Sequence, residues 1–123
     1  MKLFVDPGHG GKDPGATGNG LVEKILNLAV ALSLEAQMQR SGIEVMLSRY
    51  VDEDVPLQQR TDRANALGAD IFLSIHHNGF DNPAARGIET YYSVRHEDSK
   101  KFAAAVQTAL SAAFPMLNRG VKN

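Results

Sequence analysis

Residues 2–11 read KLFVDPGHGG, and this stretch sets the pattern from which the fold is predicted. Residues 2–5 form a short apolar run that predicts a buried strand, which Asp6-Pro7 brings to an end. Residues 8–20 are dense in glycine and predict a loop. The chain therefore begins with a strand that runs straight into a glycine-rich loop.

Helical and strand-like patterns alternate along the rest of the chain. Apolar residues recur at helical spacing in residues 23–40 and predict a helix there: Ile25, Leu28, Ala29, Leu32 and Ala36. Two further helices are expected, one from Pro56 to Gly68 and one between Asp98 and Pro115. Alternating or continuous apolar runs predict strands at residues 43–47, 70–77 and 88–93.

Strands that alternate with helices predict an α/β fold, with a largely parallel twisted sheet flanked by helices on both faces. The β-rich residues 70–77 are expected at the centre of this sheet, covered on both faces. Ligands of such sheets bind beyond the carboxyl ends of the strands. The glycine-rich loop and the His76-His77 pair each follow a strand, so we expect them to converge at this edge.

The composition narrows the classes of ligand. The chain has 123 residues, the size of one domain, and its 13 Lys and Arg against 14 Asp and Glu leave a net charge of -1. This balance gives no broad attraction to DNA, RNA or anionic lipid, so we expect no nucleic-acid and no membrane partner. Because the chain contains no cysteine, any metal must be held by His, Asp or Glu.

The glycine-rich loop raises the possibility of a phosphate site, which its spacing disfavours. A P-loop would need Gly where Asp6 stands and Ser or Thr where Asp13 follows Lys12. A dinucleotide fingerprint that begins at Gly8 would need Gly at position 13, where the Asp13 carboxylate would repel a pyrophosphate. Nucleotide binding is therefore a minor hypothesis.

Three side chains remain that could carry chemistry: His9 in the loop, Glu23 at the start of the first helix, and His76 at the end of a strand. Each also has an ordinary role, as a surface histidine, a helix-start carboxylate and a hydrogen-bonded core histidine. Two histidines and one carboxylate form a catalytic zinc set with a fourth position left for water. Their wide spacing excludes a compact finger-like site, but the residues alone leave the metal site and the ordinary roles open.

Short motifs run through the chain in a fixed order. They are Asp6-Pro7-Gly8-His9-Gly10-Gly11, Asp13, Gly15-Ala16, Glu23-Lys24, Ser48-Arg49, Arg60, Ala64-Asn65, Ala69-Asp70, Ser74-Ile75-His76-His77-Asn78 and Gly87-Ile88-Glu89. Each motif alone is weakly specific. Together they resemble the zinc-dependent N-acetylmuramoyl-L-alanine amidases, which hydrolyse bacterial cell walls, and the resemblance covers residues 2–122.

The resemblance implies a zinc ion (Zn2+) held by His9, Glu23 and His76. In the family, the histidine ligand follows Ser-Ile and precedes one small residue and then Asn, which assigns this ligand to His76. Strand alternation agrees, because neighbouring side chains of a strand face opposite sides. We therefore expect His77 to pack or to support the site. We expect three other polar residues to fasten the loop and the helices: Asp13, Arg49 and Arg60.

The resemblance also implies the reaction, which is hydrolysis of the amide between N-acetylmuramic acid and L-alanine by zinc-activated water. Family members continue past the Asn118–Lys122 segment into a strand region with a glutamate that acts as general base, so this base would lie beyond Asn123. We therefore predict that residues 1–123 are the amidase catalytic domain without its C-terminal strand region. Loss of a positioned acid or base costs about 10²–10⁴-fold in rate, so we expect weak or no activity from these residues alone.

Two other functions stay open: a peptidoglycan-binding module that lacks the chemistry, and a metallohydrolase of another peptide-like amide. We expect peptidoglycan as partner and a monomeric chain, although a bare sheet edge would allow association of the truncated chain. The first residues do not resemble an export signal. The setting is therefore either a phage endolysin that waits in the cytoplasm or a domain excised from a secreted autolysin, and both act on the bacterial cell wall.

Overall fold

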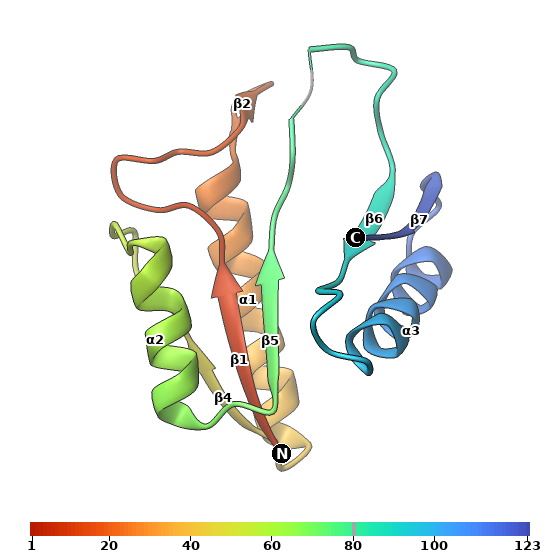
Figure 1. The fold of residues 1–123 in the computed structure, drawn as a ribbon. Helices are drawn as coiled ribbons and strands as arrows, with labels where there is room; N and C mark the ends of the chain where they lie inside the picture. The colour runs from red at the N-terminus through yellow and green to blue at the C-terminus, as the bar shows by residue number, and fades with distance from the viewer. Residues whose placement is uncertain (80) are drawn as a thin grey trace. The chain divides into compact units, whose positions relative to one another are not determined.

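The computed structural model describes residues 1–79 and 81–123, and the chain divides into two compact units. The first unit is Met1–Gly79, and the second runs from there to Asn123. Figure 1 shows the elements of both units along the chain. Within the described residues, no helix combines the length and the apolar character that crossing a membrane requires.

The first unit is built on a parallel sheet of three strands, as the alternation of elements predicts (Figure 1). These are β1 (Lys2–Pro7), β4 (Glu44–Leu47) and β5 (Ile71–Ile75), in the order β4-β1-β5. The expectation that residues 70–77 form the centre is wrong, because β1 is central and β5 lies at one side of this sheet. Strand β5 also alternates in burial along its length and is not covered on both faces.

Helix α1 (Glu23–Arg40) covers one face of the sheet, where odd-numbered strand residues form the core. The buried cluster consists of Leu3, Val5, Ala31, Val45 and Leu47. The apolar spacing that predicts this helix does not mark its buried face, since Ile25 is 59% and Leu32 39% exposed. Instead, the helix turns Glu23, Asn27 and Ala31 inward.

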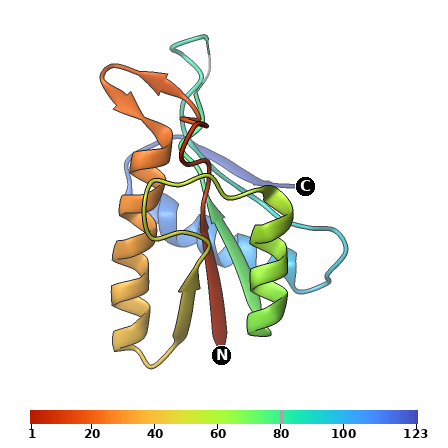
Figure 2. The same cartoon turned by 90° about the vertical axis from the view of Figure 1, so that its left-hand side faces the viewer.

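Helix α2 (Leu57–Leu67) lies on the other face, so the predicted helices on both faces are confirmed for this unit. Its buried residues are Arg60 and Ala64, and Arg60 pairs with Asp6, which points away from the α1 side of β1. The helix ends at Gly68, which takes a left-handed conformation with φ 68°. In Figure 2, α1 (orange) and α2 (green) lie on either side of the strands.

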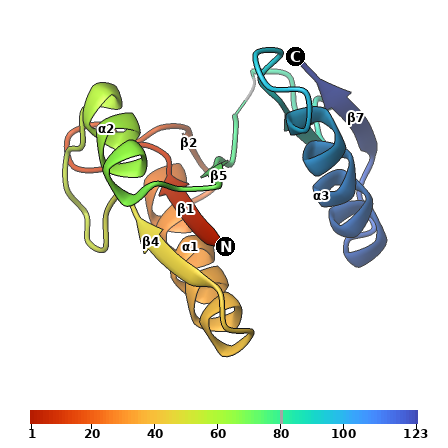
Figure 3. The same ribbon diagram turned by 60° about the horizontal axis from the view of Figure 1, so that its bottom comes forward.

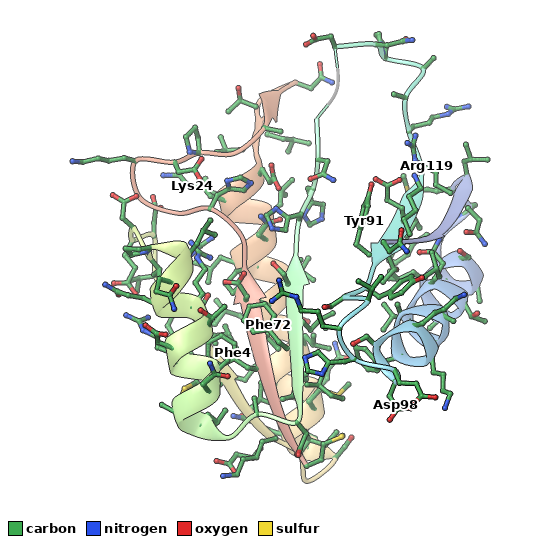
Figure 4. All side chains as sticks on the ribbon, in the orientation of Figure 1. Phe4, Lys24, Phe72, Tyr91, Asp98 and Arg119 are labelled. Atoms are coloured by element: carbon green, nitrogen blue, oxygen red, sulfur yellow. The ribbon has the colours of Figure 1, made fainter. Side chains whose placement is uncertain are left out.

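The α2 face of the sheet also carries an aromatic pair. The rings of Phe4 and Phe72 stack with their centroids 5.5 Å apart, and Figure 4 labels both side chains. Phe4 is fully buried in the centre of the sheet, whereas Phe72 on β5 is 43% exposed. The packing on this face is therefore densest over β1, the strand that leads to the glycine-rich loop.

The predicted loop after β1 contains a short antiparallel hairpin, which the sequence did not indicate. Its strands are β2 (Thr17–Gly18) and β3 (Leu21–Val22). The chain turns at Asn19 and Gly20, which both have positive φ. The hairpin returns the chain directly to the first residue of α1.

The second unit contains two parallel strands and a helix. Strand β6 (Ile88–Tyr91) pairs with β7 (Asn118–Lys122), and α3 (Ser99–Ala113) connects them (Figure 3). Strand β7 was not predicted, because its sequence NRGVK has one β-branched residue and no alternation. The buried Gln107 joins the elements by donating to Ile88 O and Asn118 Oδ1.

Candidate metal centre

His9 lies immediately beyond β1 in an unusual backbone conformation. Its φ is 62°, in the left-handed region that residues other than glycine rarely adopt. Its carbonyl oxygen accepts two hydrogen bonds, from Arg49 Nε and Arg60 Nη2, each at 2.9 Å. Both arginines are buried, and they also donate to Pro7 O. The prediction that Arg49 and Arg60 fasten the loop is therefore confirmed.

Glu23 is the first residue of α1 and is only 4% exposed. Its Oε2 accepts a hydrogen bond from the Ala16 amide at 2.8 Å, and its Oε1 accepts one from the His77 amide at 3.1 Å. Burial raises the pKa of Glu23, but these amides and the His76 ring outweigh burial, so the pKa lies below its ordinary value. The carboxylate is therefore held in its charged form, which is the form that binds metal.

His76 follows β5, and its Nδ1 lies 3.0 Å from Glu23 Oε1. The same carboxylate oxygen lies 3.2 Å from His9 Nε2. The two imidazole rings meet edge to face with centroids 5.0 Å apart. One ligand atom from each of the three residues lies within 4.8 Å of the other two. The structure thus brings together the three residues that the sequence singles out.

The donor set suits zinc. Tetrahedral zinc with nitrogen and oxygen ligands at about 2.0–2.2 Å places those ligand atoms about 3.3–3.5 Å apart. The distances from Glu23 Oε1 to His76 Nδ1 and His9 Nε2 are 3.0 and 3.2 Å, close to this spacing, and the ligand atoms of all three residues lie within 4.8 Å of one another. Three protein ligands leave one position for water or substrate, which is typical of catalytic zinc sites.

Asp13 orients the His9 ring. Its Oδ2 lies 2.7 Å from His9 Nδ1, and its Oδ1 accepts a hydrogen bond from the Gly15 amide at 3.0 Å. The bond to the His9 ring, with the Gly15 amide next, lowers the pKa of Asp13. A carboxylate on the far nitrogen of an imidazole fixes its tautomer and leaves the other nitrogen free for a metal. Asp13 therefore fastens the loop, as predicted, and also directs Nε2 of His9 toward Glu23.

Asn27, which the sequence analysis missed, supports the site from within α1. It is fully buried, its Nδ2 donates to Gly8 O at 3.0 Å, and its Oδ1 lies 2.8 Å from Nδ1 of His77. The signal in the sequence is a polar residue four positions after Glu23, on the same side of a largely apolar helix. His77 thus directs its ring to Asn27, while its backbone amide contacts Glu23.

A cleft of about 330 Å³ opens beside the three residues. It is lined by the loop after β1, by His76 and by the segment that leads into α2: Asp6, Gly8, His9, Gly10, Asp13, Asp54, Val55, Pro56, Leu57, Arg60 and His76. Glu23 is buried and is not among these lining residues, whereas both imidazoles are. A ligand in the cleft would therefore meet the open side of the candidate metal centre.

Comparison with known proteins points to one family. A family model described as N-acetylmuramoyl-L-alanine amidase matches residues 3–123. The N-acetylmuramoyl-L-alanine amidase LytC of Bacillus subtilis is 43% identical over 122 residues, covering 98% of this chain and 25% of LytC. The amidase AmiA of Salmonella typhimurium is 44% identical over 90 residues, covering 72% of this chain and 31% of AmiA.

Solved structures show the same likeness. The catalytic domain of CwlV, an N-acetylmuramoyl-L-alanine amidase from Bacillus (Paenibacillus) polymyxa var. colistinus, matches with a TM-score of 0.92 and 37% identity. The match covers 98% of this chain and 68% of that domain. This chain therefore spans about a quarter of LytC and about two thirds of a solved catalytic domain. With a family model matched from residue 3 to residue 123, the chain belongs to the N-acetylmuramoyl-L-alanine amidase family.

Proposed function

We propose that this chain is the metal-binding part of a zinc-dependent amidase, which hydrolyses the amide between N-acetylmuramic acid and L-alanine in bacterial peptidoglycan. The observation that carries the proposal is the convergence of His9, Glu23 and His76 on one point beside an open cleft. Membership of the amidase family supports the choice of substrate. The protein would then act on the bacterial cell wall.

Three residues of this chain would bind the metal, and a fourth would orient one of them. His9 Nε2, the Glu23 carboxylate and His76 Nδ1 would be its ligands, and Asp13 would keep the proton of His9 on Nδ1. Zinc supplies a Lewis acid for a carbonyl group and lowers the pKa of water to about 7. The cleft between His9 and the start of α2 would position the scissile amide.

A further proton acceptor would be needed for full activity. The residues that line the cleft in the described structure include aspartates but no glutamate, and Asp13 is already bonded to His9. The family resemblance implies a glutamate that acts as general base, so we propose that residues 1–123 assayed alone bind zinc but hydrolyse the amide slowly or not at all. A positioned acid or base typically contributes about 10²–10⁴-fold.

The experiment measures two properties of the same protein. Metal analysis after zinc incubation and desalting is expected to give one zinc per chain, lost in His9→Ala and His76→Ala. His96→Ala, which changes an exposed histidine outside the site, is the matched control and is expected to retain zinc. A wild-type chain without zinc would contradict the proposal.

Release of muropeptides from purified wall sacculi then identifies the bond that is cleaved. New L-alanine amino termini would support the amidase, whereas cleavage only of other peptide-like amides would favour a different metallohydrolase. Sedimentation with sacculi, without bound zinc and without any cleavage, would favour a peptidoglycan-binding module. Size-exclusion chromatography of the same samples tests the expected monomer against association through a sheet edge.

A further inference from the structure

A buried ion pair lies beside the loop that carries His9. Asp6 on β1 and Arg60 on α2 are each 5% exposed, and Arg60 Nη1 donates to Asp6 Oδ1 at 2.7 Å. The Asp6 carboxylate also accepts hydrogen bonds from Ser48 Oγ at 2.6 Å and Ser74 Oγ at 2.9 Å, which hold it in one place. A buried ion pair often adds little to the stability of a fold, because both charges lose their hydration. We therefore looked for another role of this pair in the contacts that Arg60 makes.

The remaining donors of Arg60 explain that position. Nη1 also donates to Pro7 O at 3.0 Å, Nη2 donates to His9 O at 2.9 Å, and Nε donates to Val55 O at 2.9 Å. A guanidinium is planar and its donors form a rigid fork, so an anchor at one nitrogen fixes the directions of the others. Asp6 thereby aims Arg60 at the two carbonyl groups on either side of Gly8.

The hydrogen bond from Arg60 to the His9 carbonyl links the buried ion pair to the metal site. The φ of His9 is 62°, and such a conformation persists only where the surroundings fix it. Rotation of the backbone away from this φ would move the carbonyl away from Arg60 and swing the ring away from Glu23. Asp13 contacts Nδ1 of the ring, but the His9 backbone is held through its carbonyl, which is bonded to the buried Arg60 and Arg49.

We infer that Arg60, held by Asp6, is a positioning residue that preorganises His9 for metal binding. Together with Arg49, whose Nε donates to the same carbonyl at 2.9 Å, Arg60 fixes the backbone of His9 so that Nε2 faces the Glu23 carboxylate before the ion arrives. This inference rests on the proposed metal site. A residue that supports a ligand in this way typically changes metal affinity by about 10- to 100-fold when it is replaced.

Arg60 also ties α2 to the sheet, and the test must separate that structural role from positioning. Arg63 provides a control on the same helix: it is exposed, it lies one turn further along α2, and its Nη1 donates to Ser48 O, away from the His9 loop. Arg60→Lys keeps a positive charge near Asp6, but an ammonium group cannot form the planar fork that reaches both carbonyls. Arg63→Lys makes the same chemical change without touching that loop.

The experiment measures the zinc dissociation constant of the wild-type chain and both variants by competition with a chelator. Arg60→Lys is expected to weaken zinc binding about 10- to 100-fold, whereas Arg63→Lys stays within about threefold of wild type. In the metal-free protein, long-range ¹H–¹⁵N spectra are expected to show a shift of the His9 ring signals in Arg60→Lys and not in Arg63→Lys. If Arg60→Lys does not fold, Asp6→Asn serves instead, because it removes the charge that orients the guanidinium.

The possible results distinguish the positioning role from the docking of α2 and from the metal site itself. Weakened zinc binding together with a shift of the His9 signals, both confined to the Arg60 or Asp6 variant, supports positioning. Equal zinc affinities of wild type and the Arg60 or Asp6 variant overturn the positioning role while leaving the metal site intact. Equal weakening by Arg60→Lys and Arg63→Lys also overturns it, because the effect would then come from docking of α2. A wild-type chain that binds no zinc overturns the metal site, and the positioning role with it.

Discussion

Oδ2 of Asp13 lies 2.7 Å from Nδ1 of His9, although Asp13 is a solvent-accessible side chain in a glycine-rich loop. The opposite nitrogen of His9 faces Glu23. The imidazole is therefore held at one end by a carboxylate that contributes little to the core, and at the other end it is offered to the metal site. This arrangement separates the effect of Asp13 on metal binding from its effect on folding.

Asp13→Asn is expected to weaken zinc binding about 10-fold, because an amide is a poorer partner for the Nδ1 proton of His9. The free energy of unfolding of the metal-free protein should stay close to that of wild type, since the side chain is exposed to solvent. Chelator competition measures the first quantity and urea unfolding the second. Equal zinc affinities of Asp13→Asn and wild type would show that this contact does not tune the site.

Gly15 has no room for a side chain. Its φ is +66°, and a Cβ there would lie 2.6 Å from both Glu23 Oε2 and His9 Cδ2. Gly15→Ala is therefore expected to destabilise the fold by about 1–2 kcal/mol and to weaken zinc binding, since two ligands must move. Gly18→Ala is the control, because a Cβ at Gly18 meets nothing within 4 Å. Calorimetry and zinc titration of the two variants give the comparison, and similar behaviour of both would contradict it.

The two sides of α1 are expected to respond differently to the same polar substitution. Ile25 is 59% exposed, so Ile25→Gln should change the free energy of unfolding by less than about 0.5 kcal/mol. Ala31 is fully buried in the core, so Ala31→Gln should cost about 3 kcal/mol by overpacking and by burial of an amide. Chemical denaturation of the two variants measures this difference, and a larger loss for Ile25→Gln would reverse the assignment of the faces.

Helix α1 also shows which features of the fold could be predicted from the sequence. The bounds of α1 were predictable because apolar residues recur at helical spacing within residues 23–40, before the stop signal at Ser41-Gly42. Its buried face was not, because Ala31, Leu34 and Met38 form a second apolar stripe, and the pattern does not say which stripe meets the sheet. The order of the parallel strands was missed for a related reason, since pairing between distant segments leaves no local signal.

The candidate site was more predictable than the packing around it. His9 and His76 follow strands and Glu23 begins a helix, so the edge of an α/β sheet is where they should meet. For the residues that support the site, the sequence predicted their role but not the atoms that they contact. The sequence predicts that Arg49 and Arg60 fasten the loop. It does not predict which carbonyl groups they contact, because those contacts join residues that are far apart in the sequence.

Glu89 is expected to make the second unit sensitive to acid. Hydrogen bonds from Lys122 and then Arg119 lower the pKa of Glu89 from 4.5 to about 2, and Figure 4 shows Arg119 beside this strand pair. Because the pKa is lowered on folding, the stabilisation is complete above pH 4.5 and is lost as the pH falls toward 2. Glu89→Gln should therefore lower stability by about 1 kcal/mol at pH 7 and by much less near pH 2.

Chemical unfolding at several pH values between 7 and 2 measures this difference. Glu97→Gln, at an exposed position in the same unit, is the control and should leave the pH dependence unchanged. A difference between Glu89→Gln and wild type that stays constant down to pH 2 would show that the ion pairs of Glu89 do not stabilise the fold.

The central claim is that His9, Glu23 and His76 hold one metal ion. Anomalous diffraction at the zinc absorption edge, from crystals grown with zinc, tests it most directly. The expected result is a single peak about 2.0–2.2 Å from His9 Nε2, a Glu23 carboxylate oxygen and His76 Nδ1. A zinc peak held by other side chains, or no peak at these three residues, would contradict the claim.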